Sequence, residues 1–287
     1  MRIWDCGLRI DKFKIRNPKS AILNMKDLLV ILWHYLGQYA KSRLAYKADF
    51  LIASFTSILA TIAGYGFVLV LFTRIPHLQG WKFEEILFIY GFSLIPMGLF
   101  NIISLNLYEF GDAYIVEGKF DRVLLRPLHS LFQVLFENFR LESLQEIIIG
   151  MAAVGYCSVK LGIPWDLTNL IEFPLLVFCG AVIYIFVFVI LSSVNFWFED
   201  RIGIAPPVYN MIAFGRYPIT IYNAFIQFLL NWIIPFAFAS FYPTVRFLGR
   251  KEFMREFYLI PLVAAAVVAL ALFVWDRGVR QYKSTGS

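Results

Sequence analysis

The side chains that can perform catalysis are few in this sequence, and their spacing matches no catalytic motif. The three histidines, His34, His77 and His129, lie far apart, and none belongs to the His-Glu-x-x-His pattern that places two zinc ligands and a general base on one helix face. The Gly-x-Ser-x-Gly turn that presents a nucleophilic serine does not occur either. We therefore expect no catalytic residues and no metal site, which disfavours a metalloprotease and an α/β-hydrolase.

A site for nucleotide hydrolysis is not expected in this chain. A phosphate-binding P-loop requires Gly, four residues, Gly, Lys and then Ser or Thr, because its backbone amides surround the phosphates and its hydroxyl binds the metal. In the most similar stretch, six residues separate Gly111 from Gly118, and Phe120 follows Lys119. Both the spacing and the residue after the lysine are wrong for this chemistry.

The same stretch has the pattern of a docking site for a partner. Asp112 can cap a short helix over residues 113–117, and Gly118 can end that helix in the left-handed conformation. Apolar and charged side chains mix along it: Tyr114, Ile115, Val116, Glu117, Lys119, Phe120, Asp121 and Arg122. A solvated turn with interfacial anchors explains this pattern about equally well, so both interpretations stay open.

The elements that must position this stretch are membrane-spanning helices. Of the 287 residues, 60% are hydrophobic and 16% are charged, whereas a soluble domain carries roughly 25% charged residues. A helix that crosses the hydrocarbon core needs about 20 predominantly apolar residues. The sequence has six such windows, near 50–73, 86–108, 147–165, 173–198, 224–242 and 257–275. We predict an all-α polytopic membrane protein with six transmembrane helices.

The fifth window is the least regular of the six. Pro218, Pro235 and Pro243 lie in or beside it, and a proline removes a backbone donor from the interior of a helix. A straight fifth helix is therefore not expected, and a broken, re-entrant course stays open, as does the depth of residues 244–256. Apart from Lys160 the six windows hold no charged residue, so we expect no ionisable proton relay inside the membrane.

Two side-chain stripes inside the windows are candidates for a solute path. Residues three or four apart share one face of a helix. The polar stripe on the first span consists of Ser54, Ser57 and Thr61, and the aromatic stripe on the fifth consists of Phe225, Phe228 and Trp232. Small hydroxyl residues in membranes commonly serve helix packing instead, and aromatic residues commonly meet lipid, so these alternatives stay open.

The distribution of basic residues predicts that both termini are cytoplasmic. With the N-terminus inside, 19 of the 26 Lys and Arg fall in segments assigned to the cytoplasm, in accord with the positive-inside rule. Four of the remaining seven lie in Arg246–Arg255, which could instead be an interfacial segment that folds back. Residues 27–46 are predicted as an elbow helix along the cytoplasmic leaflet, with a solvated capping helix as the alternative, and residues 1–26 as a cytoplasmic extension.

The docking stretch resembles a known signature. Residues 117–128, Glu-Gly-Lys-Phe-Asp-Arg-Val-Leu-Leu-Arg-Pro-Leu, are similar to the Glu-Gly-x-x-Asp-x-x-Leu-x-Arg-Pro pattern of bacterial ABC-2 type exporter permeases, in the branch long catalogued as a domain of unknown function. Further similarities follow in the same order at residues 46–50, 215–222, 235–249 and 278–287. The resemblance covers about residues 30 to 287.

This resemblance implies a six-span ABC-2 permease domain over residues 27–287, with no cofactor of its own. Such a permease pairs with a second permease, the same or a related chain, and with two cytoplasmic ABC ATPase subunits that carry ATP and Mg²⁺. The loop after the second span would be the coupling helix, so Glu117, Gly118, Lys119, Phe120, Asp121 and Arg122 would contact the ATPase.

The expected location is the bacterial cytoplasmic (inner) membrane, with lipid as a partner and no nucleic acid. An apolar and aromatic interior would suit an amphiphilic or lipophilic cargo better than a sugar. Two other functions remain open, a secondary carrier or channel and a membrane scaffold that transports nothing.

Overall fold

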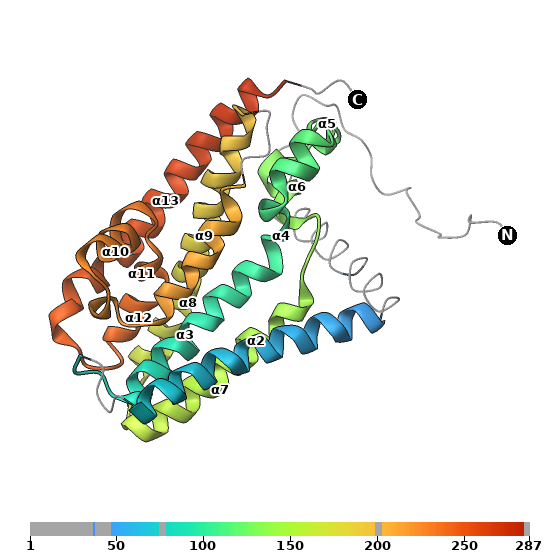
Figure 1. The fold of residues 1–287 in the computed structure, drawn as a ribbon. Coiled ribbons are helices and arrows are strands. Elements are labelled where there is room, and N and C mark those ends of the chain that lie inside the picture. The colour runs from blue at the N-terminus through green and yellow to red at the C-terminus, as the bar shows by residue number, and fades with distance from the viewer. Residues whose placement is uncertain (1–36, 38–46, 75–78, 199–202, 284–287) are drawn as a thin grey trace.

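The computed structural model in Figure 1 describes residues 37, 47–74, 79–198 and 203–283. The predicted N-terminal extension (1–26) and, apart from one residue, the predicted elbow helix (27–46) lie outside the described residues. The helical bundle that the structure describes begins at Lys47.

Five helices in the described part of the chain are long and apolar enough to cross a membrane. They are α2 (Lys47–Arg74), α3 (Phe83–Ile103), α7 (Leu144–Leu161), α8 (Leu167–Ser193) and α13 (Met254–Gln281). Each corresponds to one of the predicted windows, which confirms the all-α polytopic fold. The shorter helices between them carry the irregular parts of the chain.

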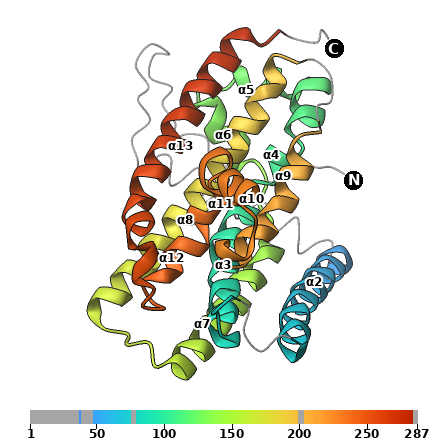
Figure 2. The same cartoon turned by 60° about the vertical axis from the view of Figure 1, so that its left-hand side comes forward.

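Helix α3 is the centre of the bundle, because most of its 21 residues are buried. It packs against α7 and α8, whereas α2 lies at the edge and touches α3, α7 and the turn Leu141–Ser143 (Figure 2). The α3–α7 crossing depends on small residues: a Cβ added at Gly150 would lie 2.6 Å from the carbonyl oxygen of Gly91. Glycines of this kind let membrane helices approach closely.

The third span is displaced toward the N-terminus relative to the predicted window 147–165. Helix α7 begins at Leu144 and ends at Leu161, where Gly162 adopts a left-handed conformation with φ of 66°. Pro164 comes next, and the Asp166 side chain accepts a 2.8 Å hydrogen bond from the Asn169 amide as the N-cap of α8. The displacement brings Glu146 into the helix, a charged residue that the window had excluded.

The fifth predicted span, 224–242, is not a single helix. It is divided into α10 (Ala224–Phe228), a π-helical turn (Leu229–Ile233), α11 (Phe236–Ala239) and α12 (Phe241–Val245). Only 224–233 forms a continuous apolar helix, and it is too short to cross a membrane by itself. The break falls at Pro235, which cannot donate to a helix, so the structure follows the broken course that the prolines left open.

Irregular backbone at this position is enclosed by protein. Phe236 to Val245 are buried, and α11 and α12 pack against α8 and α13. Lipid cannot hydrogen-bond to free backbone groups, so a broken segment is tolerated in a membrane where it is surrounded by other helices.

The basic loop after α12 is held by acidic residues of two other helices. Arg250 pairs with Glu85 of α3 at 2.8 Å and lies 4.3 Å from the ring centroid of Trp81, while Arg246 pairs with Glu172 of α8. Two of the four basic residues that opposed the predicted topology are therefore neutralised locally. This explains physically how they can occupy the end of the bundle opposite the 117–122 segment (Figure 1).

Candidate functional site

The 117–122 segment lies at the same end of the bundle as the C-terminal end of α13 (Figure 1). It follows a π-helical turn over Phe110–Val116, and from Lys119 onward it is part of α5 (Lys119–Leu124). Gly118 has φ of 71°, which confirms the predicted left-handed reversal. The predicted cap is wrong: Asp112 lies inside the first turn, and the capping position is Glu109, which makes no side-chain cap.

Phe120 anchors this segment to the bundle. Its side chain is 0% exposed, and its ring centroid lies 5.0 Å from those of Phe196 and Tyr282 and 6.2 Å from that of Trp275. Phe196 follows α8, and Trp275 and Tyr282 belong to the end of α13. Phe120 is therefore a packing residue that joins α5 to two spans, and it does not contribute exposed surface.

Polar contacts hold the segment on its other sides. The side-chain amide of Gln133 in α6 (Ser130–Phe136) donates to the carbonyls of Val123 and Leu128, at 3.0 and 2.9 Å. Burial, and then the neighbouring Asp121 carboxylate, raise the pKa of the Tyr282 hydroxyl to about 12. Both contacts fix the position of α5 relative to the membrane helices.

The exposed part of this region is an apolar tip with basic neighbours. We call it the α5 tip and define it as Arg122, Leu124, Leu125, Arg126 and Pro127. Leu125 is 85% exposed, and the other four are also exposed. Glu117 and Lys119 pair with each other at 3.2 Å beside it. Sequence reasoning named Arg122 but missed Leu124 and Leu125, because their exposure depends on how α5 is turned.

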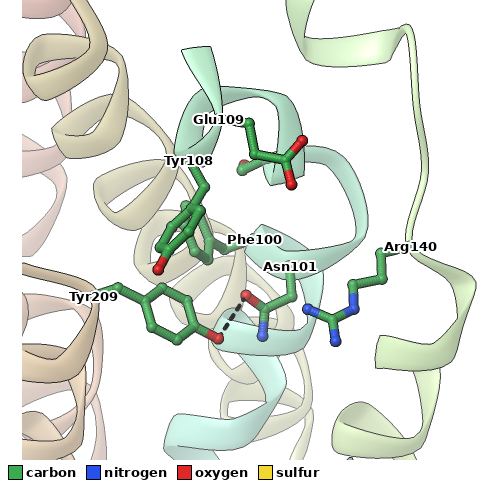
Figure 3. A pocket seen from close by; sticks show the side chains of 7 residues that line it. Phe100, Asn101, Tyr108, Glu109, Arg140 and Tyr209 are labelled. Atoms are coloured by element: carbon green, nitrogen blue, oxygen red, sulfur yellow. Dashed lines mark hydrogen bonds between the residues drawn. The ribbon is translucent and has the colours of Figure 1, made fainter. Parts of the chain in front are cut away.

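A second polar group lies inside the bundle. The Asn101 amide of α3 donates to the Glu146 carboxylate of α7 at 2.8 Å, and the Tyr209 hydroxyl of α9 (Ala205–Met211) donates to the Asn101 side-chain oxygen at 3.2 Å (Figure 3). Glu146 is only 8% exposed, and Ser57 of α2 lines the same cavity. Three helices, α3, α7 and α9, therefore meet through one hydrogen-bonded chain.

Two arginines come close to this chain from irregular segments. Arg216 ends the 3₁₀ turn Ile212–Arg216, donates to the Tyr90 hydroxyl at 3.1 Å, and approaches the Met97 sulfur at 3.0 Å. Arg140 precedes the turn Leu141–Ser143, and its backbone amide donates to the carbonyl of Ile102 at 2.8 Å. Both arginines act electrostatically on Glu146 without forming an ion pair with it in the described structure.

Two neighbouring cavities surround these groups. The larger, about 450 Å³, is bounded by α2, α3, α7 and the arginines; we call it the polar cavity. Its lining residues are Ala53, Thr56, Ser57, Ala60, Thr61, Leu94, Met97, Arg140, Glu146, Tyr209 and Arg216. The smaller, about 280 Å³, shares Arg140 and Tyr209 with it and is shown in Figure 3.

The predicted solute-path residues are divided between two environments. Ser57 and Thr61 line the polar cavity, whereas Ser54 does not. The Thr61 hydroxyl also donates to the Ser57 carbonyl at 2.9 Å, the packing contact that such residues often make. The aromatic stripe is exposed and does not line the polar cavity: Phe225, Phe228 and Trp232. A role of these residues in a solute path stays a prediction.

A buried carboxylate, Glu146, belongs to α7 although the predicted third window excluded it. This residue lies one position before the predicted third window and became part of α7 when the helix began at Leu144. Asn101, a polar residue inside the second window, was a usable signal, because a buried amide requires a partner. Nothing in the linear sequence connects Asn101 to Glu146, Tyr209 or Arg216.

Comparison with known proteins identifies one relationship. The family model described as ABC-2 family transporter protein matches residues 58–286, which include the 117–122 segment and most of the polar cavity. No curated protein and no solved structure matches the chain.

Proposed function

The chain belongs to the ABC-2 family of transporter proteins, and on this premise we propose that it is the permease subunit of an ATP-driven exporter. It would form half of the translocation pathway and couple to a separate ABC ATPase through the 117–122 segment and the α5 tip. In this proposal two ATPase subunits carry ATP and Mg²⁺, and a second permease completes the pathway in the cytoplasmic membrane, with both termini inside.

The observation that carries the coupling assignment is the contrast between the two faces of α5. One face is fixed, because Phe120 is fully buried among the ends of α8 and α13. The opposite face exposes Leu125 with Arg122 and Arg126 beside it. An exposed apolar group with charged residues beside it is suited to binding a protein partner. A turn that only faces solvent would not require such an apolar group.

The anchoring supports a mechanical route from this partner to the spans. A movement of the α5 tip would be carried by Phe120 to Phe196 and Trp275, since packed aromatic side chains transmit displacement with little compression. The permease would then change between two packings by rigid-body or shear motion of helices. In this mechanism the chain itself breaks no bond, and the energy comes from the ATPase.

Leu125→Asp tests the coupling assignment. We expect the variant to lose co-purification with its co-expressed ABC ATPase, because a charge would replace the apolar group at the centre of the contact. The fold should survive, since Leu125 makes little contact with the rest of the chain. Lys251→Asp, at the opposite end of the bundle, is the matched control and should retain the complex. Undiminished association of the Leu125→Asp variant would refute the assignment.

A further inference from the structure

We propose that the polar cavity binds the anionic group of an amphiphilic solute. The proposal rests on the transport function above and names the class of substrate for it. Its basis is that the two arginines of this cavity form no ion pair with any described residue, whereas Glu146, the carboxylate among its described lining residues, is already hydrogen-bonded.

Among the described residues, the hydrogen-bond partners of Arg216 are neutral. Its guanidinium donates to the Tyr90 hydroxyl and approaches the Met97 sulfur, and its Nε is buried without a hydrogen-bond partner. An arginine does not lose its proton in a protein, so the positive charge remains. A buried positive charge that faces a cavity and forms no ion pair with a described residue is a strong point of attraction for an anion.

Arg140 is a second positive group on the same cavity. Its guanidinium makes no hydrogen bond or ion pair with any other described residue, although its backbone is fixed to Ile102. In Figure 3 the guanidinium points toward Asn101, which lines the smaller cavity, and Arg140 itself lines both cavities. Two arginines presented to one space can provide the forked donors that carboxylate, phosphate and sulfate groups accept.

The carboxylate of the polar cavity is less available than the arginines. Glu146 accepts from the Asn101 amide at 2.8 Å and is only 8% exposed. Glu109 lines only the smaller cavity. A cationic solute would therefore meet two arginines and an occupied carboxylate, whereas an anion would meet unpaired donors.

The remaining walls and the depth of the site favour an amphiphile over a small hydrophilic anion. The polar cavity also exposes Ala53, Ala60, Leu94 and Met97. Tyr90 and Met97, which contact Arg216, lie about 10 and 20 Å along α3 from Phe83 at the helical rise of about 1.5 Å per residue. Arg216 is therefore near the middle of the span, and a solute that reaches it passes apolar surface.

Calorimetric titration of the full chain in phosphatidylcholine nanodiscs tests this proposal. The anionic probe is octyl phosphate, and octyltrimethylammonium is the cationic probe with the same tail. Heats from empty nanodiscs are subtracted to remove partition into lipid. We expect saturable binding of octyl phosphate and no saturable binding of octyltrimethylammonium.

Charge-removing variants locate the binding. Arg140→Gln and Arg216→Gln should each weaken octyl phosphate binding by at least about tenfold, because each removes a charge-assisted hydrogen bond. Arg216→Lys keeps the charge and should bind more tightly than Arg216→Gln, which separates loss of charge from loss of fold. Lys160→Gln is the matched control, because Lys160 is a basic residue of α7 that does not line the cavity.

Equal binding of the two probes, or unchanged octyl phosphate binding in both arginine variants, would overturn the proposal. Binding of inorganic phosphate as tight as that of octyl phosphate would overturn the requirement for an apolar tail. Adding phosphatidylglycerol to the nanodiscs distinguishes a bilayer lipid from a free solute as the anionic amphiphile. Competition with octyl phosphate would identify the lipid, and a lack of competition would identify the free solute. Either result supports the proposed substrate class.

This titration is independent of the ATPase. If octyl phosphate fails to bind while the ATPase complex depends on Leu125, the substrate class is wrong and the permease assignment stands. If octyl phosphate binds but the complex does not depend on Leu125, the coupling assignment fails and the anion site stands.

Discussion

Phe120 belongs to the predicted coupling segment, but its side chain is part of the buried core. It lies in the middle of the stretch that resembles the coupling signature, yet its ring is buried among Phe110, Phe196, Trp275 and Tyr282. Its neighbours along the chain provide the charged surface, and Phe120 fixes where that surface lies.

Phe120→Ala should therefore uncouple the α5 tip from the spans. Removing a buried aromatic side chain costs about 3–5 kcal/mol when the surroundings do not collapse. We expect faster amide hydrogen exchange over residues 110–126 and a lower unfolding temperature in detergent. Leu125→Ala is the control, because that side chain is exposed and its removal should leave both quantities nearly unchanged. Equal exchange in the two variants would contradict the anchoring role.

Tyr282 provides a pH test of the same anchor. Burial and the neighbouring Asp121 carboxylate raise the pKa of its hydroxyl from 10.0 to about 12. Because the folded pKa exceeds the unfolded one, the contact contributes its full stability below pH 10 and loses it as the pH rises from about 10 to about 12. The α5 region should become more open to hydrogen exchange across that interval.

Tyr282→Phe is the matched variant for that measurement. It cannot ionise, so its exchange over residues 119–124 should show no step between pH 10 and 12 beyond the intrinsic rate change. The difference in ultraviolet absorbance between the wild type and this variant should titrate near pH 12. A difference titration near pH 10 would show that the Tyr282 hydroxyl is not buried beside Asp121 as described.

At the scale of elements, the α3–α7 crossing depends on the absence of side chains at two facing glycines. A Cβ at Gly150 would lie 2.6 Å from the Gly91 carbonyl oxygen and 2.9 Å from an Ile95 side-chain carbon. Backbone of a packed helix cannot yield as a flexible side chain can, so the two helices would have to separate. Asn101 and Glu146 are on these same helices, and their 2.8 Å hydrogen bond depends on the close spacing of α3 and α7.

Gly150→Ala and Gly155→Ala should consequently have opposite effects on stability, although both lie in α7. Gly150→Ala should destabilise the protein by about 1–3 kcal/mol through overpacking. Gly155 has open space within 4 Å of its added Cβ, so its replacement should stabilise the helix by up to about 1 kcal/mol. The free energy of unfolding in mixed micelles measures both, and a stabilising Gly150→Ala would show that the crossing is looser than described.

At the scale of the whole molecule, the α5 tip and the 246–253 loop lie at opposite ends of the bundle (Figure 1). This arrangement agrees with the proposed coupling to an ATPase at one membrane surface only. The pairs Arg250–Glu85 and Arg246–Glu172 join the loop to α3 and α8 at that second end.

Single-cysteine labelling tests the proposed orientation. In a background without Cys6, and with the buried Cys157 and Cys179 retained, Leu125→Cys should react with a membrane-impermeant maleimide only in inside-out vesicles. Lys251→Cys should react only in intact, right-side-out cells. The reverse pattern would invert the topology and remove the α5 tip from contact with a cytoplasmic ATPase.

Local patterns in the sequence determined the long spans and the reversal at Gly118. Helices α2, α3, α8 and α13 each overlap most of an uncharged window, because a helix in lipid must satisfy its own backbone and present mainly apolar side chains. Gly118 is left-handed because a residue without a Cβ takes that conformation at little cost. Both are properties of short stretches of chain.

Tertiary structure alone decided the broken course of 224–245 and the polar cavity. Prolines showed that the fifth window would bend, but its enclosure by α8 and α13 is what makes the break tolerable. Asn101, Glu146, Tyr209 and Arg216 come from four segments, and their hydrogen bonds and charges become a site only when α3, α7 and α9 meet. Hydropathy is a property of consecutive residues. The partners of a buried polar group, in contrast, are far away in the sequence, so no local pattern indicates which residues they are.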